Sequence, residues 1–164
     1  MNFEETYNRL FKRVLAYIAS RVNAQTTAQE LAADTWQQVW LHQDQFNRAK
    51  GSEEQWIFTI ARNQVNKHLR FWQIKRFFSL TEQEEGVASH EKTPLEQLTQ
   101  QEKQQVLLAA FATLSSRERD LLALKFQSAL NNRQIAQMTG LSESNVGTIV
   151  NRALNKLRSQ LEGL

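Results

Sequence analysis

Cysteine is absent from this 164-residue sequence, and proline and glycine are scarce, with one and five residues respectively. Without cysteine the chain has neither disulfides nor thiolate metal ligands, which is typical of proteins that work in a reducing cytoplasm. No apolar run approaches the ~20 residues of a membrane-spanning helix, and the acidic start Met1–Glu5 is unlike a signal peptide. We therefore expect a cytoplasmic protein without membrane insertion of its own.

Abundant Leu, Gln, Ala, Glu and Arg beside so little proline and glycine indicate a helical protein. Apolar residues recur at helical spacing from Phe3 to Ile18, which predicts a first helix over about 3–22. No stretch alternates apolar and polar residues in the manner of a strand. The predicted fold class is therefore all-α.

Several further helix starts are marked by a capping residue followed three positions later by Glu or Gln, the pattern of a capping box. The pattern occurs at Thr27/Glu30, Ser52/Gln55, Ser115/Glu118 and Asn131/Gln134. The first pair predicts a helix to about His42, and the second a helix from about Glu53 to Arg76. Thr93 followed by Pro94 predicts another helix start, because proline is well suited to the first helical position.

Charge divides the chain into three blocks. Residues 1–77 carry 11 Lys and Arg against 7 Asp and Glu, and residues 103–164 carry 8 against 4. Residues 78–102 between them carry 1 against 6 and lose helical periodicity after Ser79. We expect two small helical domains, 1–77 and 103–164, joined by a flexible acidic linker. A polyanion would be attracted to both basic blocks, although ordinary solvated faces would give the same charges.

The segment from Asn131 to Val146 has the spacing of a helix-turn-helix. Ala136 is small where two helices must approach, and Gly140 can adopt the positive φ that ends a helix. Ser142 suits the N-cap of the next helix, and Val146 its first inward residue. Two short helices joined in this way present one helix to the DNA major groove.

The final helix, over about 143–161, has an apolar side and a polar side. The polar side combines small hydroxyl and amide groups, which hydrogen-bond base edges, with cations that suit phosphates. Its candidate DNA-contacting residues are Ser144, Gly147, Thr148, Asn151, Arg152, Asn155 and Arg158. A plain helical hairpin with a solvated outer face is the alternative interpretation.

The third predicted helix also has two sides, because Ile57, Ala61, Val65, Leu69 and Trp72 fall on one of them. The opposite side holds amides and cations but no acid, and a basic loop precedes the helix. Cations neutralise phosphates while amides and an exposed ring accommodate unstacked bases, although a solvated face remains the alternative. The candidate residues are Asn47, Arg48, Lys50, Ser52, Trp56, Arg62, Asn63, Asn66, Lys67 and Arg70.

Motifs for catalysis or metal binding are missing. His42, His68 and His90 lie far apart, and none pairs with a carboxylate at helical ligand spacing. There is no phosphate-cradling glycine loop and no nucleophile motif. We expect no enzymatic activity, no metal and no cofactor.

Taken together, the two halves resemble the extracytoplasmic-function (ECF) sigma factors, the two-domain class of bacterial RNA polymerase specificity subunits. The resemblance is carried by Ala28 to Trp40, by Trp56 to Asn63 with Arg70, and by Leu114 to Leu122 with Ile135 to Leu157. It implies that the second domain recognises the minus-thirty-five promoter element and the first melts and captures the minus-ten element. It also implies that the acidic linker occupies the nucleic-acid channel of the polymerase.

The resemblance further implies a polymerase-binding helix with contacts at Glu30, Ala33, Asp34 and Gln37. Ala33 departs from the family pattern, in which an amide stands between the two acids. Lys67 replaces a common acid. Gly147 and Ile149 replace residues that are often basic, and Gly147 costs ~1 kcal/mol of helix propensity, which suggests close approach to DNA or local flexibility.

Two further expectations concern partners. The family is usually held by an anti-sigma protein, and here we expect its docking surface near Trp36, Val39 and Trp40, unless the core consumes these side chains. The rival interpretation of the whole chain is a stand-alone helix-turn-helix regulator with an N-terminal sensing or dimerisation domain. That rival leaves the acid-free side of the third helix unexplained.

Overall fold

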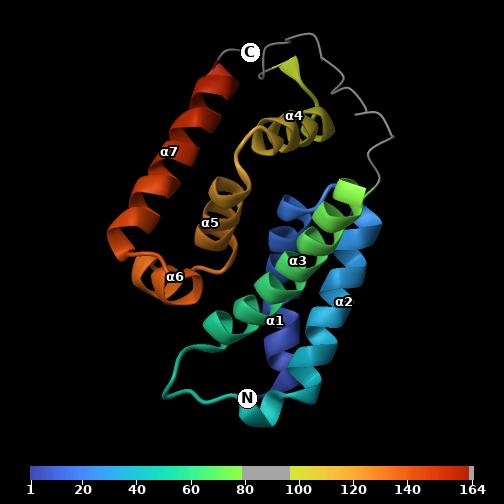
Figure 1. The fold of residues 1–164 in the computed structure, drawn as a ribbon, viewed down its shortest axis with the longest axis vertical. Coiled ribbons are helices and arrows are strands. Elements are labelled where there is room, and N and C mark those ends of the chain that lie inside the picture. The colour runs from blue at the N-terminus through green and yellow to red at the C-terminus, as the bar shows by residue number, and fades with distance from the viewer. Residues whose placement is uncertain (79–96, 163–164) are drawn as a thin grey trace.

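The computed structural model describes residues 1–78 and 97–162 (Figure 1). The helices in chain order are α1 (Phe3–Arg21), α2 (Gln25–Leu41), the short 3-10 helix η1 (Gln43–Gln45), α3 (Glu53–Phe78), α4 (Gln100–Ala112), α5 (Ser116–Gln127), α6 (Asn132–Thr139) and α7 (Glu143–Glu162). Neither described segment contains a strand, so the all-α prediction is confirmed. The helix start predicted at Thr93 and most of the predicted linker lie outside the described residues. No helix of the two described segments is long and apolar enough to cross a bilayer.

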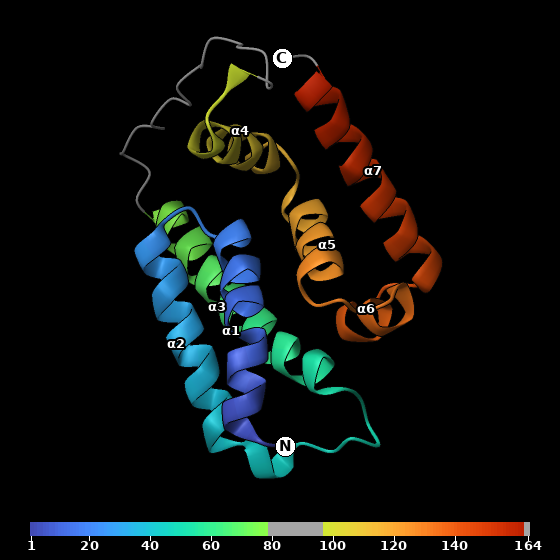
Figure 2. The same ribbon diagram turned by 180° about the vertical axis from the view of Figure 1, so that it is seen from behind.

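The first three long helices, α1, α2 and α3, pack side by side as one unit (Figures 1 and 2). Each contributes one apolar side, and the fully buried members are Leu10, Val14, Ile18, Val39, Ile57, Phe58, Ala61 and Val65. Trp36 of α2 adds an aromatic layer, since its ring lies edge-on to that of Tyr7 at 4.9 Å between centroids. The helical periodicity seen in the sequence therefore corresponds to the core of this unit.

Two sequence expectations for this unit are wrong. The Thr27/Glu30 pair does not begin α2, because the helix starts at Gln25 and the Ala28 amide already donates to the Ala24 carbonyl at 3.0 Å. Trp72, expected among the inward residues of α3, is 44% exposed. It lies at the end of the packed stretch, beside the turn between α1 and α2, where too little of the neighbouring helices remains to cover an indole.

The second unit comprises α4 to α7 and contains the predicted helix-turn-helix in α6 and α7. Gly140 ends α6 with φ of 74°, and its amide donates to the Ala136 carbonyl at 2.9 Å. The Ser142 hydroxyl then accepts from the Asn145 amide at 3.1 Å and begins α7. Ile135 and Val146 are fully buried between these helices and α5. The turn chemistry read from the sequence is confirmed.

Capping boxes begin three of the helices in this unit. Both reciprocal bonds are present at Ser115/Glu118 and Asn131/Gln134, as predicted, and at Thr99/Glu102, which was not singled out from the sequence. Each box satisfies two amides that would otherwise lack partners at a helix start. Local sequence therefore fixes where these helices begin.

The two units lie against each other through α1 and α5, with α6 beside α3 (Figures 1 and 2). Tyr17 of α1 is fully buried at this junction. In addition, the Arg13 Nε donates to the Gln127 carbonyl at 2.6 Å, and the side-chain Nε2 of Gln55 donates to the Gln137 Oε1 at 3.1 Å. The predicted pair of helical units is thus present, and the units pack together.

We predict that Ser115→Ala lowers the free energy of unfolding by about 1 kcal/mol, the usual effect of losing an N-cap. The Glu118 amide would lose its hydroxyl partner at 3.1 Å. Urea denaturation followed by circular dichroism measures this change. Thr27→Ala is the matched control, since Thr27 lies inside α2 and caps nothing there; an equal loss of stability in both variants would contradict the assignment.

Candidate functional site

The polar side of α7 is open to solvent. Its inward residues Val146, Val150 and Ala153 are buried against the rest of the second unit. All the candidate contacts except Gly147 are exposed, namely Ser144, Thr148, Asn151, Arg152, Asn155 and Arg158. The structure therefore brings the six predicted side chains together on one accessible helix face, and the helix lies at the edge of the molecule (Figure 1).

The structure gives a reason for glycine at position 147 that the sequence did not reveal. A Cβ placed on it would lie 3.3 Å from the Asn132 Nδ2 at the start of α6, which is closer than an ordinary van der Waals contact. Glycine thus lets α6 and α7 approach. Close packing within the helix-turn-helix is therefore a further reason for glycine here, beside the approach to DNA or local flexibility expected from the sequence.

An ion pair braces α7 on α5. The Lys156 Nζ donates to the Glu118 Oε1 at 2.7 Å. The hydrogen bond from Lys156, together with those from the Ser115 cap, holds the pKa of the Glu118 carboxyl below its usual range. The Glu118 carboxylate therefore takes part in the cap of α5 and also contacts Lys156 of α7.

The candidate polymerase contacts Glu30, Ala33, Asp34 and Gln37 share one exposed face of α2. On the opposite side of the helix Ala32, Thr35 and Trp36 are buried. Glu30 and Asp34, one turn apart, make no ion pair with the described residues. The face can thus offer two uncompensated carboxylates to a partner.

The apolar rim expected near Trp36, Val39 and Trp40 is mostly core. Val39 is fully buried and Trp36 only 5% exposed, because both contribute to the packing of α1 against α2. Trp40 alone is exposed, at 56%. The three side chains therefore do not form the docking surface expected from the sequence.

The basic loop before α3 is ordered by its own side chains. The Asn47 Oδ1 accepts from the Ala49 amide at 2.9 Å, and the Phe46 ring packs on that of Trp56 at 5.6 Å. Arg48 and Lys50 are exposed, while Ser52 caps α3 through the Gln55 amide at 3.1 Å. The loop therefore presents cations beside a half-buried indole.

The polar side of α3 is divided into an open and a covered part. Asn63, Lys67 and Arg70 are exposed. Arg62 and Asn66 instead make contacts at the junction between the units: the Arg62 Nε lies 2.9 Å from the Asp120 Oδ2 of α5, and the Asn66 Oδ1 accepts from the Arg21 Nη1 at 2.8 Å. The structure thus leaves only part of this predicted face accessible.

Asp120 is the centre of that junction and was missed by the sequence analysis. Its buried carboxylate accepts from the Tyr17 hydroxyl at 2.7 Å, pairs with Arg62, and lies 3.4 Å from the Arg21 Nη1. Burial, followed by the charge of Asp120, raises the pKa of Tyr17. In the sequence, only the acid-free side of α3 could have indicated such an acid, since Arg62 has no acidic partner on its own helix face.

Within residues 1–78 and 97–162, no group of three or more His, Asp or Glu side chains is placed to hold a metal ion. What the fold presents instead is a helix-turn-helix with an exposed polar helix, and a three-helix unit with an acidic face and a basic face. This arrangement defines a transcription protein that combines DNA recognition with a second, protein-binding or DNA-binding unit.

Comparison with known proteins identifies the family. Residues 6–72 match the Sigma-70 region 2 family, and residues 110–159 match the Sigma-70 region 4 family. The chain is 26% identical to the RNA polymerase sigma factor YlaC of Bacillus subtilis, covering 98% of this chain and 92% of that protein. It is also 26% identical to the ECF RNA polymerase sigma factor RpoE of Cereibacter sphaeroides, covering 97% and 86%.

Solved structures show the same fold. The sigma factor RpoE in complex with the anti-sigma factor NepR from Bartonella quintana matches with a TM-score of 0.81 at 24% identity, over 98% of this chain and 97% of that one. CnrH, in complex with the cytosolic domain of CnrY, matches with a TM-score of 0.66 at 19% identity, over 98% and 88%. The chain belongs to the ECF sigma factors and directs promoter-specific transcription initiation.

We predict that Asp120→Asn loosens the junction between the two units. Removing one partner from a buried ion pair typically costs ~3–5 kcal/mol, and the change would leave Arg21 and Arg62 without a carboxylate. Small-angle scattering of the full chain should then show a larger radius of gyration, with the helical circular-dichroism signal retained. Asp44→Asn, at an exposed position, is the control, and an unchanged radius for Asp120→Asn would contradict this role.

Proposed function

We propose that the chain recognises promoters with two separate domains, 1–77 and 103–164, joined by the acidic segment 78–102. The second domain binds the minus-thirty-five element as duplex, with the polar face of α7 in the major groove. The observation that carries this proposal is the exposure of six polar side chains on one face of the second helix of a helix-turn-helix. Thr148, Asn151 and Arg152 are the base readers, whereas Arg158 contacts phosphate.

The first domain captures an unstacked base of the minus-ten element. The base enters between the basic loop and α3, where its extrusion costs a few kcal/mol that pocket hydrogen bonds and phosphate contacts offset. The residues involved are Asn47, Arg48, Lys50, Ser52, Trp56, Arg62, Asn63, Asn66, Lys67 and Arg70. In the structure described above the two units are packed together, which we call the closed arrangement, and Arg62 is paired with Asp120. Full use of this face therefore requires the two units to separate.

Core RNA polymerase docks on the acidic face of α2, at Glu30, Ala33, Asp34 and Gln37. Support comes from the exposure of all four residues and from the two carboxylates left without an ion pair among the described residues. Ala33 offers no hydrogen bond, so the two acids and Gln37 carry the polar recognition. A stand-alone regulator would need no such face, and the family assignment does not favour that alternative.

The chain acts in the cytoplasm, catalyses no reaction itself and needs no metal or cofactor. An anti-sigma factor is its inhibitory partner. The support is the similarity in fold to the sigma factor RpoE in complex with the anti-sigma factor NepR, and to CnrH in complex with the cytosolic domain of CnrY. Since Trp36 and Val39 are core residues, Trp40 is the one of these three side chains that the partner can contact on that rim.

We predict that Glu30→Lys combined with Asp34→Lys abolishes pull-down of core polymerase, because reversing two charges turns attraction into repulsion. Both residues are exposed, so the helical circular-dichroism signal should be retained. The matched control is Glu4→Lys with Glu5→Lys, which makes the same charge change at exposed positions of α1. Retained pull-down by the α2 variant would remove the docking assignment.

We predict that Asn151→Ala and Thr148→Ala each relax preference at one base pair of the upstream element, at a cost of ~1–3 kcal/mol. Arg158→Ala should instead weaken binding to all sequences alike, because a phosphate contact carries no sequence information. Selection from a randomised duplex library, read by sequencing, measures both effects. Selection of an unchanged sequence by Asn151→Ala and Thr148→Ala would show that another surface reads the bases.

A further inference from the structure

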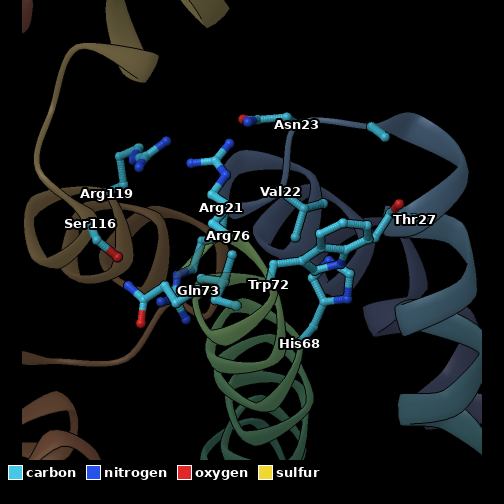
Figure 3. Close-up of a pocket in the computed structure, with 12 residues that line it drawn as sticks. Arg21, Val22, Asn23, Thr27, His68, Trp72, Gln73, Arg76, Ser116 and Arg119 are labelled. Atoms are coloured by element: carbon cyan, nitrogen blue, oxygen red, sulfur yellow. The ribbon is translucent and has the colours of Figure 1, made fainter. Parts of the chain in front are cut away.

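A cavity of about 420 Å³ lies where the end of α3 meets the turn between α1 and α2 and the start of α5 (Figure 3). Both units contribute to its lining. His68 and Trp72 of α3 stand on one side, and Ser116 and Arg119 of α5 on the other. Its volume falls within the range of ~300–1,000 Å³ found for small-molecule sites. No function has been assigned to this cavity by the promoter and polymerase faces described above.

The charge of the cavity is of one sign. Arg21, Arg76 and Arg119 line it, and no Asp or Glu is among its lining residues. Arg21 is compensated by Asp120 at 3.4 Å. Neither Arg76 nor Arg119 makes an ion pair with any residue of the described segments. Among the described residues, these two guanidinium groups therefore line the cavity without an ion-pair partner.

Arg119 makes the strongest case for a ligand. Its Nε is buried and finds no hydrogen-bond partner within the described residues. Burial, and then the nearby charge of Arg21, lowers the pKa of its guanidinium, so its environment opposes the charge that it carries. A buried donor without a partner costs free energy that a bound anion would recover. The Ser116 hydroxyl and the first turn of α5 add further donors beside it.

Aromatic side chains form the other wall. The Trp72 indole is 44% exposed and lies 6.1 Å from the His68 ring. An exposed indole is costly in water but gives a base a surface for stacking. Cations opposite an aromatic wall match a ligand with a charged end and a flat ring.

We propose that this cavity binds a nucleotide carrying two or more phosphate groups. Arg76 and Arg119 hold the phosphates, because guanidinium groups form paired hydrogen bonds with phosphate oxygens. Trp72 contacts the base. Since α3 and α5 belong to different units, the bound nucleotide bridges them and favours their closed arrangement. Arg76, Arg119 and Trp72 belong to neither the proposed promoter faces nor the proposed polymerase face.

Isothermal titration calorimetry of the full chain with GDP, ADP and inorganic pyrophosphate tests the proposal. All three should bind, the nucleotides at least about fivefold more tightly than pyrophosphate because of base stacking. Arg76→Gln and Arg119→Gln should each weaken binding about tenfold or more, the usual effect of losing a charged hydrogen bond. Trp72→Leu should weaken nucleotide binding and leave pyrophosphate binding unchanged.

Arg133→Gln, at an exposed position on α6 outside the cavity, is the control and should bind as the parent chain does. Arg76 is exposed, so its variant separates loss of binding from loss of folding. No heat of binding at millimolar concentrations of all three probes would overturn the proposal, as would undiminished binding by Arg76→Gln and Arg119→Gln. Binding of duplex DNA, but not of nucleotides, that depends on these two arginines would also overturn it. Polymerase pull-down by Arg76→Gln should stay intact in every case, which keeps this test separate from that of the sigma-factor assignment.

Discussion

The carboxylate of Asp120 is the interaction on which the closed arrangement depends. Among the described residues it is the one acid that forms ion pairs between the two units, and it accepts from Tyr17 while it pairs with Arg62 and lies 3.4 Å from Arg21. A buried carboxylate is costly unless several donors surround it, and a buried ion pair is a poor source of net stability. What such a network does supply is specificity, since only one relative placement of α1, α3 and α5 satisfies all of its members. The network therefore specifies one placement of the units while adding little net stability, which is consistent with the proposed separation of the units on DNA.

The same carboxylate occupies Arg62, a residue of the proposed minus-ten face. Arg62 belongs to the proposed minus-ten face, and it cannot offer its Nε to a phosphate or a base while it donates to Asp120. The reading face of α7, in contrast, is exposed in the closed arrangement. The two recognition surfaces thus differ in availability within one conformation. It follows that duplex recognition needs no rearrangement, whereas capture of the melted strand must compete with an internal acid.

Sequence reasoning succeeded where the cause of structure is local. The Ser115 box, the positive φ of Gly140 and the Ser142 cap depend on residues within four positions, and all are present. The Thr27/Glu30 pattern failed because the backbone bond from Ala28 to Ala24 had already begun the helix, so packing of the first unit outweighed a local signal. Asp120 and the role of Gly147 could not be found from the sequence, because Asp120 acts on residues 58 and 103 positions away, and Gly147 on a residue of the preceding helix. Periodicity predicted the exposed polar face of α7, whereas it could not show that Arg62 and Asn66 of α3 are engaged at the junction, because their partners lie on other helices.

Arg21 connects the ion pairs of Asp120 to the neighbouring cavity. Arg21 lies 3.4 Å from Asp120 on one side and lines the cavity with Arg119 on the other, so Asp120 compensates Arg21 and Arg62 while Arg119 has no ion pair among the described residues. Burial, and then the charge of Arg21, lowers the pKa of the Arg119 guanidinium, so a positive charge in this partly buried space is unfavourable. An anion that enters the cavity relieves this repulsion with the units together. Phosphates that engage Arg62 relieve it with the units apart. Under the proposed nucleotide site, the anion that compensates these arginines contributes to the balance between packed and separated units, alongside apolar contact.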